Sequence, residues 1–423
     1  MLLGIACAGT GLAQSPPQQK LTLRQAEELA LKNHPLVLAA QDLASASGEQ
    51  VREARAAYYP TLNGDLTGSQ GNVGARIGAG FLTDSRLFNR FGQGVTLSQL
   101  ITDLGRTNNL VASSKLQQRA AQQDYQATRY DVLLAVNQAY FNTLQAKAVV
   151  KVAQETVANR QQLFEQISAL AANKLRSELD VSYANVNLSD AKLMLIRAQD
   201  TLEQAYAQLA RAMGTEQAVT FELTEEALPT SPPQQSDPLV SEALANRPEL
   251  ASLRLNYQAA HRFAEAEKDL SRPSVSLVGV AGFVPLINFP GVPAVYEGAA
   301  VNVDIPILNG HLFAARREAA RYRASAAQHR LENEQLRVAR DVRTAWGGAT
   351  TAYQRLDVAA QFVQQATQAL DLAQGRYDLG LSSIVELTQA QLNLTRAEIE
   401  NVAATYDYQM QYSVLQFSMG ALR

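Results

Sequence analysis

The feature that most constrains this chain is a duplication that covers almost its whole length. Residues 33–37 read NHPLV and residues 246–250 read NRPEL, and each phrase opens a helical pattern that stops at a second proline. The segment from Pro35 to Pro60 aligns without a gap on the segment from Pro248 to Pro273, 213 positions later. Repeats this long indicate two copies of one structural unit rather than a solenoid of short modules.

Beyond these prolines the copies align at a constant spacing of 206 positions, which one deletion of seven residues explains. The matched positions are Val95 with Val301, Asp103 with Asn309, Tyr140 with Trp346, Asp180 with Glu386, and Met213-Gly214 with Met419-Gly420. We therefore predict a first structural repeat at 22–214, a linker at 215–237 and a second structural repeat at 238–420.

Each copy predicts the same order of elements: a helix, two strands, a long helix and a shorter helix. A proline stops the first helix because proline lacks the N–H and disfavours helix in the residue before it. Apolar residues then alternate with polar or small ones, which is typical of strands. The first helices are expected at 36–58 and 249–271, and the strands at about 61–72, 91–102, 274–284 and 296–306.

The long helices are expected at about 105–173 and 310–379, where no proline occurs. At a rise of about 1.5 Å per residue each would reach roughly 100 Å, several times the ~30 Å of a hydrocarbon core. The shorter helices at 178–213 and 384–418 carry an apolar seam in steps of three and four, and in the first copy large residues alternate with alanine along it. This pattern predicts close coiled-coil packing in a mainly α chain with a small β part.

The composition argues against several classes of protein. The formal net charge is −3, so no basic field points to nucleic acid. Cys7 is the single cysteine, and the four histidines are scattered without the spacing of metal ligands. The sequence has no nucleophile elbow. We therefore expect no enzyme activity, no cofactor and no metal site.

The start of the chain is typical of a targeting segment. Residues 1–13, MLLGIACAGTGLA, are apolar or small and end in a small-x-small pattern, as the end of a secretory signal peptide does. The residues before Cys7 make a poor lipobox, so lipidation is not the expectation. No later segment is apolar enough to span a membrane as a helix. The sequence thus predicts an exported chain.

Four strands cannot close a barrel and would leave open edges at the end of a rod. Two chains would supply eight strands, which side chains fill, whereas three chains would supply twelve and leave a lumen. In an exported chain without a spanning helix, such strands suggest an outer-membrane barrel shared between copies. The helical rods would continue from this barrel as a tube.

The chain resembles the TolC-like outer-membrane efflux proteins across nearly its whole mature length. The resemblance rests on the two N-x-P phrases, the strand-to-helix phrases QLITDLGR (99–106) and IPILNGHL (305–312), and the phrase LGLSSIVELTQAQLNL (379–394). It implies a homotrimer with a 12-stranded outer-membrane β-barrel, continued by a periplasmic α-helical barrel with an equatorial belt at the linker. It also implies three kinds of partner: a periplasmic adaptor protein, an inner-membrane transporter and outer-membrane lipid.

The function that this resemblance implies is the exit duct of a tripartite efflux or type I secretion system, a passive conduit for small molecules or exported proteins. An alternative is a structural or adhesive coiled-coil protein of the envelope without a pore. That alternative explains the rods but not the four strands at matched positions. A periplasmic hydrolase on a helical scaffold is a third class, and the missing catalytic motifs argue against it.

The turns that join each long helix to its short helix carry the candidate site residues. Ser177 with Asp180, and Ser383 with Glu386, have the spacing of capping boxes, and Gly380 suits the left-handed end of a helix. The resemblance implies that these turns form the closed periplasmic end of the tube. There, three copies each of Asp180 and Glu386 would form an acidic ring at the pore entrance.

The resemblance also implies a gate near these turns. The family's gate uses an arginine near Ser382 and a second acid near Gln389, and this sequence has neither. We take Arg176 and Tyr377 as candidate substitutes. The other candidates at the periplasmic tip are Lys174, Ser177, Asp378, Gly380, Ser382 and Ser383.

Overall fold

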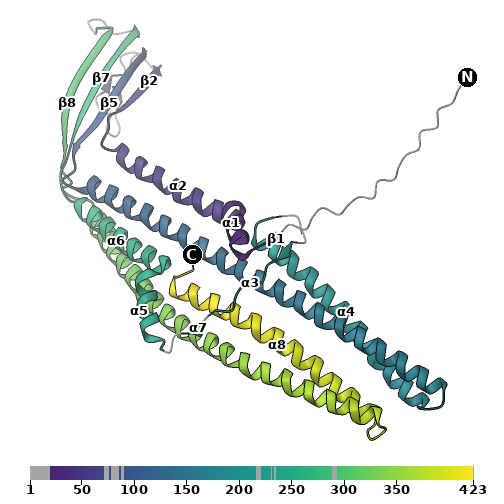
Figure 1. Ribbon diagram of the computed structural model, residues 1–423. Helices are drawn as coiled ribbons and strands as arrows, with labels where there is room; N and C mark the ends of the chain where they lie inside the picture. The colour runs from purple at the N-terminus through teal and green to yellow at the C-terminus, as the bar shows by residue number, and fades with distance from the viewer. Residues whose placement is uncertain are drawn as a thin grey trace, which may run out of the picture. The chain divides into compact units, whose positions relative to one another are not determined.

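The computed structural model describes residues 20–70, 76–77, 85–86, 90–215, 221–229, 231–232, 235–287 and 293–422 (Figure 1). The predicted end of the signal peptide, with Cys7, lies outside these residues. The chain forms two compact units, which we call the helical unit and the strand unit. The helical unit comprises residues up to 38, 128–246 and 338–423, and the strand unit comprises 39–127 and 247–337.

The strand unit holds a four-stranded antiparallel sheet in the order β2-β5-β7-β8 (Figure 1). Its strands are β2 (Thr61–Ser69), β5 (Arg90–Thr102), β7 (Ser274–Ile287) and β8 (Val295–Asp304), at the four predicted places. The short strands β3 (Arg76–Ile77) and β4 (Ser85–Arg86), which the sequence did not predict, pair with each other. Within the described chain, β2 and β8 each have one edge without a strand partner.

The register of this sheet separates an apolar face from a polar face, because side chains alternate between the faces of a strand. One face carries Leu62, Leu66, Val95, Leu97, Val275, Leu277, Ala281, Phe283, Val301 and Val303, with Glu297 as a charged exception. The other carries Thr61, Asn63, Asp65, Thr96, Ser98, Ser276, Asn302 and Asp304, with Val278 and Val280 among them. Many of the apolar residues are exposed, so this face needs an apolar environment.

A tight turn joins β5 to the long helix α3 (Arg106–Ala172). Leu104 and Gly105 adopt positive φ there, 55° and 117°. The Asp103 carboxylate accepts hydrogen bonds from the Thr107 amide at 2.7 Å and the Thr107 hydroxyl at 2.6 Å, so it caps the new helix. The guanidinium of Arg272 donates to the Leu104 carbonyl at 2.7 Å, which fixes the turn against the segment that precedes β7.

The helices lie within a few residues of their predicted bounds. They are α2 (Pro35–Ala56), α3, α4 (Glu178–Ala212), α6 (Pro248–Asp269), α7 (Leu312–Asp378) and α8 (Ile384–Met419). The predicted seam of α4 is confirmed, since each of its positions from Val181 to Leu209 is buried or half-buried. None of the helices in the described residues is both long and apolar enough to cross a membrane.

Three features of the helical unit were not predicted. Two of them are the short helices α1 (Leu23–Asn33) and α5 (Asp237–Asn246). The third is the parallel pairing of β1 (Lys20–Leu21) with β6 (Glu222–Leu223). Tyr140 of α3 is fully buried, and its hydroxyl lies 2.9 Å from the Leu21 carbonyl and 2.6 Å from the Thr224 carbonyl. This tyrosine therefore ties the short parallel pair to the long helix.

The backbone itself repeats at the spacing of 206 positions. Eight residues have positive φ among those described, and they form four pairs at this spacing: Leu104 with Gly310, Gly105 with His311, Lys174 with Gly380, and Gly214 with Gly420. The left-handed conformation is costly for residues other than glycine. Its retention at Leu104, Lys174 and His311 shows that the two copies share these turn conformations even where the residue type differs.

Candidate functional site

The two turns at the ends of the helical hairpins are built alike. Lys174, with φ of 59°, ends α3, and Gly380, with φ of 72°, ends α7. In each turn one amide bonds back five residues and the preceding amide bonds back three, for example Leu381 to Arg376 at 2.8 Å and Gly380 to Tyr377 at 3.0 Å. This pattern is a Schellman motif, which satisfies the last carbonyls of a helix.

The predicted capping boxes differ between the copies. At α4 the box is confirmed: the Ser177 hydroxyl accepts from the Asp180 amide at 3.1 Å, and the Asp180 carboxylate accepts from the Ser177 amide at 3.2 Å. At α8 only half of it forms, because Ser383 accepts from the Glu386 amide at 3.4 Å while the Glu386 carboxylate accepts instead from Arg376 Nε at 3.0 Å. Arg376 was not among the predicted residues.

Arg176 and Tyr377, named together from the sequence, are in contact across the two hairpins. Arg176 donates from Nη2 to the Tyr377 carbonyl at 2.7 Å, and its guanidinium carbon lies 4.1 Å from the centroid of the Tyr377 ring. The carbonyl thus accepts both this bond and the bond from the Gly380 amide. Burial raises the pKa of Tyr377, and the nearby Arg176 opposes that rise. This pair is a direct link between the α3–α4 and α7–α8 hairpins.

The other predicted tip residues make no hydrogen bond or ion pair across the two hairpins in the described structure. Asp378 accepts from Gln374 Nε2 at 2.9 Å on the same helix, and Lys174 is exposed at its left-handed position. The Ser382 hydroxyl and the Tyr377 hydroxyl are buried without a hydrogen-bond partner. The structure therefore places Asp378 and Lys174 as residues that shape single turns, in contrast to Arg176.

A small apolar core lies directly behind the turns. It consists of Leu163, Ile167, Ala184, Tyr377, Ile384 and Leu387 and joins both hairpins. Four leucines of the turns and first helical residues stay largely exposed: Leu175, Leu179, Leu379 and Leu381. These leucines were not among the predicted site residues. They could have been found as apolar residues that lie outside the seam and beside the turn.

Polar side chains also bridge the hairpins farther from the tip. Arg160 of α3 is buried and donates to Gln391 of α8, and Asn187 of α4 donates to the Thr388 hydroxyl at 3.0 Å. Burial lowers the pKa of Arg160 to about 10. Arg160 borders a hollow of about 860 Å³ that Glu398 also lines. Sequence reasoning missed this seam, because hydrogen-bonded polar pairs leave no periodic signal.

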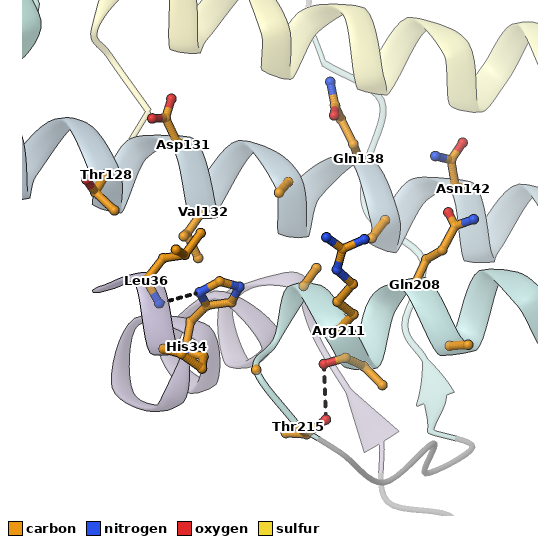
Figure 2. Close-up of a pocket in the computed structure, with 17 residues that line it drawn as sticks. His34, Leu36, Thr128, Asp131, Val132, Gln138, Asn142, Gln208, Arg211 and Thr215 are labelled. Carbon is orange, nitrogen blue, oxygen red and sulfur yellow. Dashed lines mark hydrogen bonds between the residues drawn. The ribbon is translucent and has the colours of Figure 1, made fainter. Parts of the chain in front are cut away.

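A second hollow, of about 1300 Å³, lies in the helical unit where the start of α2 meets the end of α4 (Figure 2). His34 Nδ1 accepts a hydrogen bond from the Leu36 amide at 3.2 Å, which caps the first turn of α2. Burial, with Arg211 nearby, lowers the pKa of His34. A neutral ring is what this bond requires, since Nδ1 must be unprotonated to accept it. Gln138 and Arg211 line the same hollow (Figure 2).

The contacts at the turns hold two helical hairpins together. In the part of the chain that the structure describes, no group of three or more His, Cys, Asp or Glu side chains could hold a metal ion. What the turns do provide is the polar link from Arg176 to Tyr377 between two helical hairpins, with acidic side chains nearby. Links of this kind can be made or broken as the hairpins approach or separate.

Comparisons with known proteins place these features in context. The model of the family described as "Outer membrane efflux protein" matches residues 27–215 and again residues 239–421. The chain is 24% identical to the outer membrane protein TolC of Escherichia coli (strain K12) over 100% of its own length and 86% of that protein. It is 23% identical to the outer membrane protein OprJ of Pseudomonas aeruginosa, over 87% of this chain and 78% of that protein.

Two solved structures share the fold. The outer membrane protein VceC of Vibrio cholerae superimposes with a TM-score of 0.82 over 94% of this chain and 96% of that chain, at 18% identity. The CmeC outer membrane channel of Campylobacter jejuni superimposes with a TM-score of 0.78 over 94% of this chain and 85% of that chain, at 20% identity. At these identities the likeness establishes the architecture of the chain.

Proposed function

Because this chain belongs to the outer membrane efflux protein family, we propose that it is the outer-membrane exit duct of a tripartite efflux or type I secretion system. In this role it is a passive conduit for small molecules or exported proteins across the periplasm and outer membrane. The observation that carries the proposal is a two-faced sheet whose β2 and β8 edges have no strand partner in the described part of the chain, together with two helices of 67 residues. A lipid-facing apolar side and a water-facing polar side are what a transmembrane barrel requires.

The duct is a homotrimer. Three copies of the four-stranded sheet supply twelve strands, and each open β8 edge meets the β2 edge of the next copy. The apolar face then contacts outer-membrane lipid and the polar face lines the lumen. In this arrangement the repeats at 22–214 and 238–420 give each protomer its pseudo-symmetry, and the linker at 215–237 contributes to an equatorial belt around the helical tube.

The tip of the hairpins is the docking end for a periplasmic adaptor protein, through which an inner-membrane transporter delivers its cargo. The exposed leucines Leu175, Leu179, Leu379 and Leu381 support this assignment, because exposed apolar clusters mark interaction sites. Full burial of one leucine contributes about 1.5–3 kcal/mol, so a few of them suffice for a specific contact. The Arg176–Tyr377 link next to them holds the entrance closed until the partner binds.

The purified protein is expected to be a trimer in mild detergent and to form conducting pores in planar lipid bilayers. Native mass measurement gives the number of copies, and single-channel recording gives the conductance. A protein that is stable as a monomer or dimer, and that inserts without conducting, would instead be a structural coiled-coil protein of the envelope. That result would overturn the proposed duct.

The acidic residues of the tip are expected to contribute unequally to ion selectivity. Asp180→Asn should lower the preference of the open pore for cations and weaken block by trivalent cations, since charged rings select ions of opposite sign. Glu386→Gln should do less, because Arg376 already neutralises this carboxylate at 3.0 Å. The amides still accept hydrogen bonds, so the loss of capping should stay within about 1 kcal/mol per helix.

Reversal potentials under a salt gradient measure this selectivity. Arg376→Gln is the matched control, because it leaves Glu386 without its ion-pair partner and should raise the preference for cations. If all three variants form trimers and keep the wild-type reversal potential and block, these acids cap their helices and do not face the ion path.

A further inference from the structure

The segment that follows strand β8 is unusually exposed for its composition. β8 ends at Asp304, and the next residues, IPIL (305–308), have no regular structure. Ile305, Ile307 and Leu308 are 59%, 93% and 92% exposed. In the first copy the equivalent residues, Gln99 to Thr102, lie inside strand β5 and pair with β7. The two copies therefore differ here, although their backbones agree on either side.

The two copies differ because residues 99–102 of β5 pair with β7 within the chain, whereas β8 lies at the edge of the sheet. β5 is the equivalent of β8 at a spacing of 206 positions, and β7 is the equivalent of β2 at a spacing of 213. Inside the chain β5 pairs with β7. The equivalent pairing would join β8 to β2, but these strands are the two open edges of one sheet. Only a second copy of the chain can supply it.

We infer that the junction between copies repeats the β5–β7 register, with β8 of one copy against β2 of the next and residues 305–308 added to β8. The inference rests on the proposed trimer and specifies its seam. Val95 pairs with Ala281 and Gln99 with Leu277 inside the chain. At the two spacings, these pairs place Val301 opposite Gly68 of the next copy and Ile305 opposite Gly64 of the next copy.

This register gives each exposed residue a role. Val303 comes to lie opposite Leu66 of the next copy, so both join one apolar face. The register shift between Leu100 and Thr102 in β5 becomes a bulge between Pro306 and Leu308. A bulge is one of the few places in a paired strand where proline is tolerated. The exposed apolar run 305–308 is thereby explained as a strand end that lacks its neighbour in the single chain.

The register also carries one unfavourable contact. Ser98 pairs with Val278 inside the chain, and the equivalent pair is Asp304 opposite Asp65 of the next copy. Like charges directly opposite are destabilising, although the Asp65 carboxylate already accepts from the Thr96 hydroxyl at 2.9 Å. A slip of two residues would avoid this pair by placing Ile305 opposite Leu62 or Leu66 of the next copy. Any test must therefore distinguish these registers.

Cysteine cross-linking of the full chain provides that test, in a Cys7→Ser background. Opposed residues in an antiparallel pair have Cα atoms about 4.5–5.5 Å apart, which suits a disulfide. An added Cβ at Gly64 meets nothing within 4 Å, and at Gly68 it meets only a Phe91 ring atom at 4.0 Å. Ile305→Cys with Gly64→Cys, and Val301→Cys with Gly68→Cys, should give at least fivefold more linked oligomer on non-reducing gels than the crossed pairs.

The crossed pairs, Ile305→Cys with Gly68→Cys and Val301→Cys with Gly64→Cys, use the same four substitutions. They lie about four residues out of register, roughly 13 Å apart, so they control for folding and thiol reactivity. Faster linking of Ile305→Cys to Leu62→Cys or Leu66→Cys would show a slipped register and overturn the inference. A trimer by mass that links no pair better than the crossed pairs would also overturn it, as expected if 305–308 face lipid. Absence of a trimer in the unsubstituted chain would count instead against the proposed duct.

Discussion

Replacing Gly214 by alanine is expected to destabilise the helical unit by about 2–5 kcal/mol and to reduce the yield of assembled protein strongly. Gly214 has φ of 71°, which costs a residue with a side chain about 1–2 kcal/mol. A Cβ added there would lie 2.6 Å from the Cα and 2.9 Å from the amide nitrogen of His34. These neighbours are backbone atoms, so the start of α2 must move, and overpacking of this kind costs about 1–3 kcal/mol.

Gly380→Ala is the matched control for this change. Gly380 ends its helix with nearly the same φ, 72°, but an added Cβ there meets nothing within 4 Å. The free energy of unfolding should therefore fall only by the cost of a left-handed alanine, about 1–2 kcal/mol. Thermal unfolding in detergent and the fraction of trimer on gels measure both variants. If the two variants lose the same stability, the close approach of Gly214 to His34 does not contribute to the fold.

The long helices and the strands of the large sheet could be predicted because the same sequence pattern occurs in both copies of the repeat. Each long helix runs for 67 residues without proline and ends at a turn, and both copies show this same pattern, so little choice of structure is left. The strands were predicted from the alternation of apolar residues between the proline that ends the first helix of each copy and the start of the long helix. Where both copies gave the same signal, helix and strand bounds came within a few residues.

The strands β1 and β6 were not predicted because their pairing joins residues far apart in the chain. β1 and β6 are only two residues each and pair across some 200 positions, with Tyr140 bonded to the carbonyls beside them. No local pattern encodes such a pair. The end of α3 before Lys174 was predicted, but the left-handed conformation of Lys174 was not, since lysine gives no signal for it and only the match to Gly380 in the other copy reveals it.

In the candidate site too, local contacts could be predicted from residue spacing, whereas contacts between distant residues could not. Asp180 completes the capping box of α4 as its spacing predicts, since its carboxylate accepts from the Ser177 amide at 3.2 Å. Glu386 has the same spacing, yet Arg376 reaches it across the turn and takes one oxygen, so the box stays half formed. The contact of Arg176 with Tyr377 joins two hairpins some 200 positions apart, and the sequence could name its members without giving the geometry that joins them.

Replacing Arg176 by serine is expected to raise the time-averaged conductance of the duct severalfold by weakening its closed state. The substitution removes a hydrogen bond of 2.7 Å to the Tyr377 carbonyl and a guanidinium stacked at 4.1 Å on the Tyr377 ring. A charged hydrogen bond contributes about 1.5–3 kcal/mol, and an exposed cation–π contact about 0.5–1 kcal/mol. Since Arg176 is half-exposed, we expect the two contacts together to stabilise the joined hairpins by about 2 kcal/mol per copy.

A loss of about 2 kcal/mol shifts the balance between joined and separated hairpins roughly 30-fold in each copy, since 1.4 kcal/mol is tenfold. Three copies around one axis make the effect on the closed entrance larger still. Single-channel recording in planar bilayers should show longer or wider open states, with trimer content and thermal stability close to wild type. Arg176→Lys should be intermediate, because it keeps the charge but not the planar guanidinium.

Arg376→Ser is the control that distinguishes the loss of a bond between the two hairpins from the loosening of a single turn. Arg376 lies near the α7–α8 turn and, like Arg176, donates to a carbonyl, here that of Leu381. It also donates to the Glu386 carboxylate, and both partners belong to its own hairpin. Its loss should loosen the α7–α8 turn and leave the mean conductance near wild type. Equal increases in both variants would mean that the stiffness of the turns sets the closed state. An increase confined to Arg176→Ser would locate the gate in the bond that joins the α3–α4 hairpin to the α7–α8 hairpin.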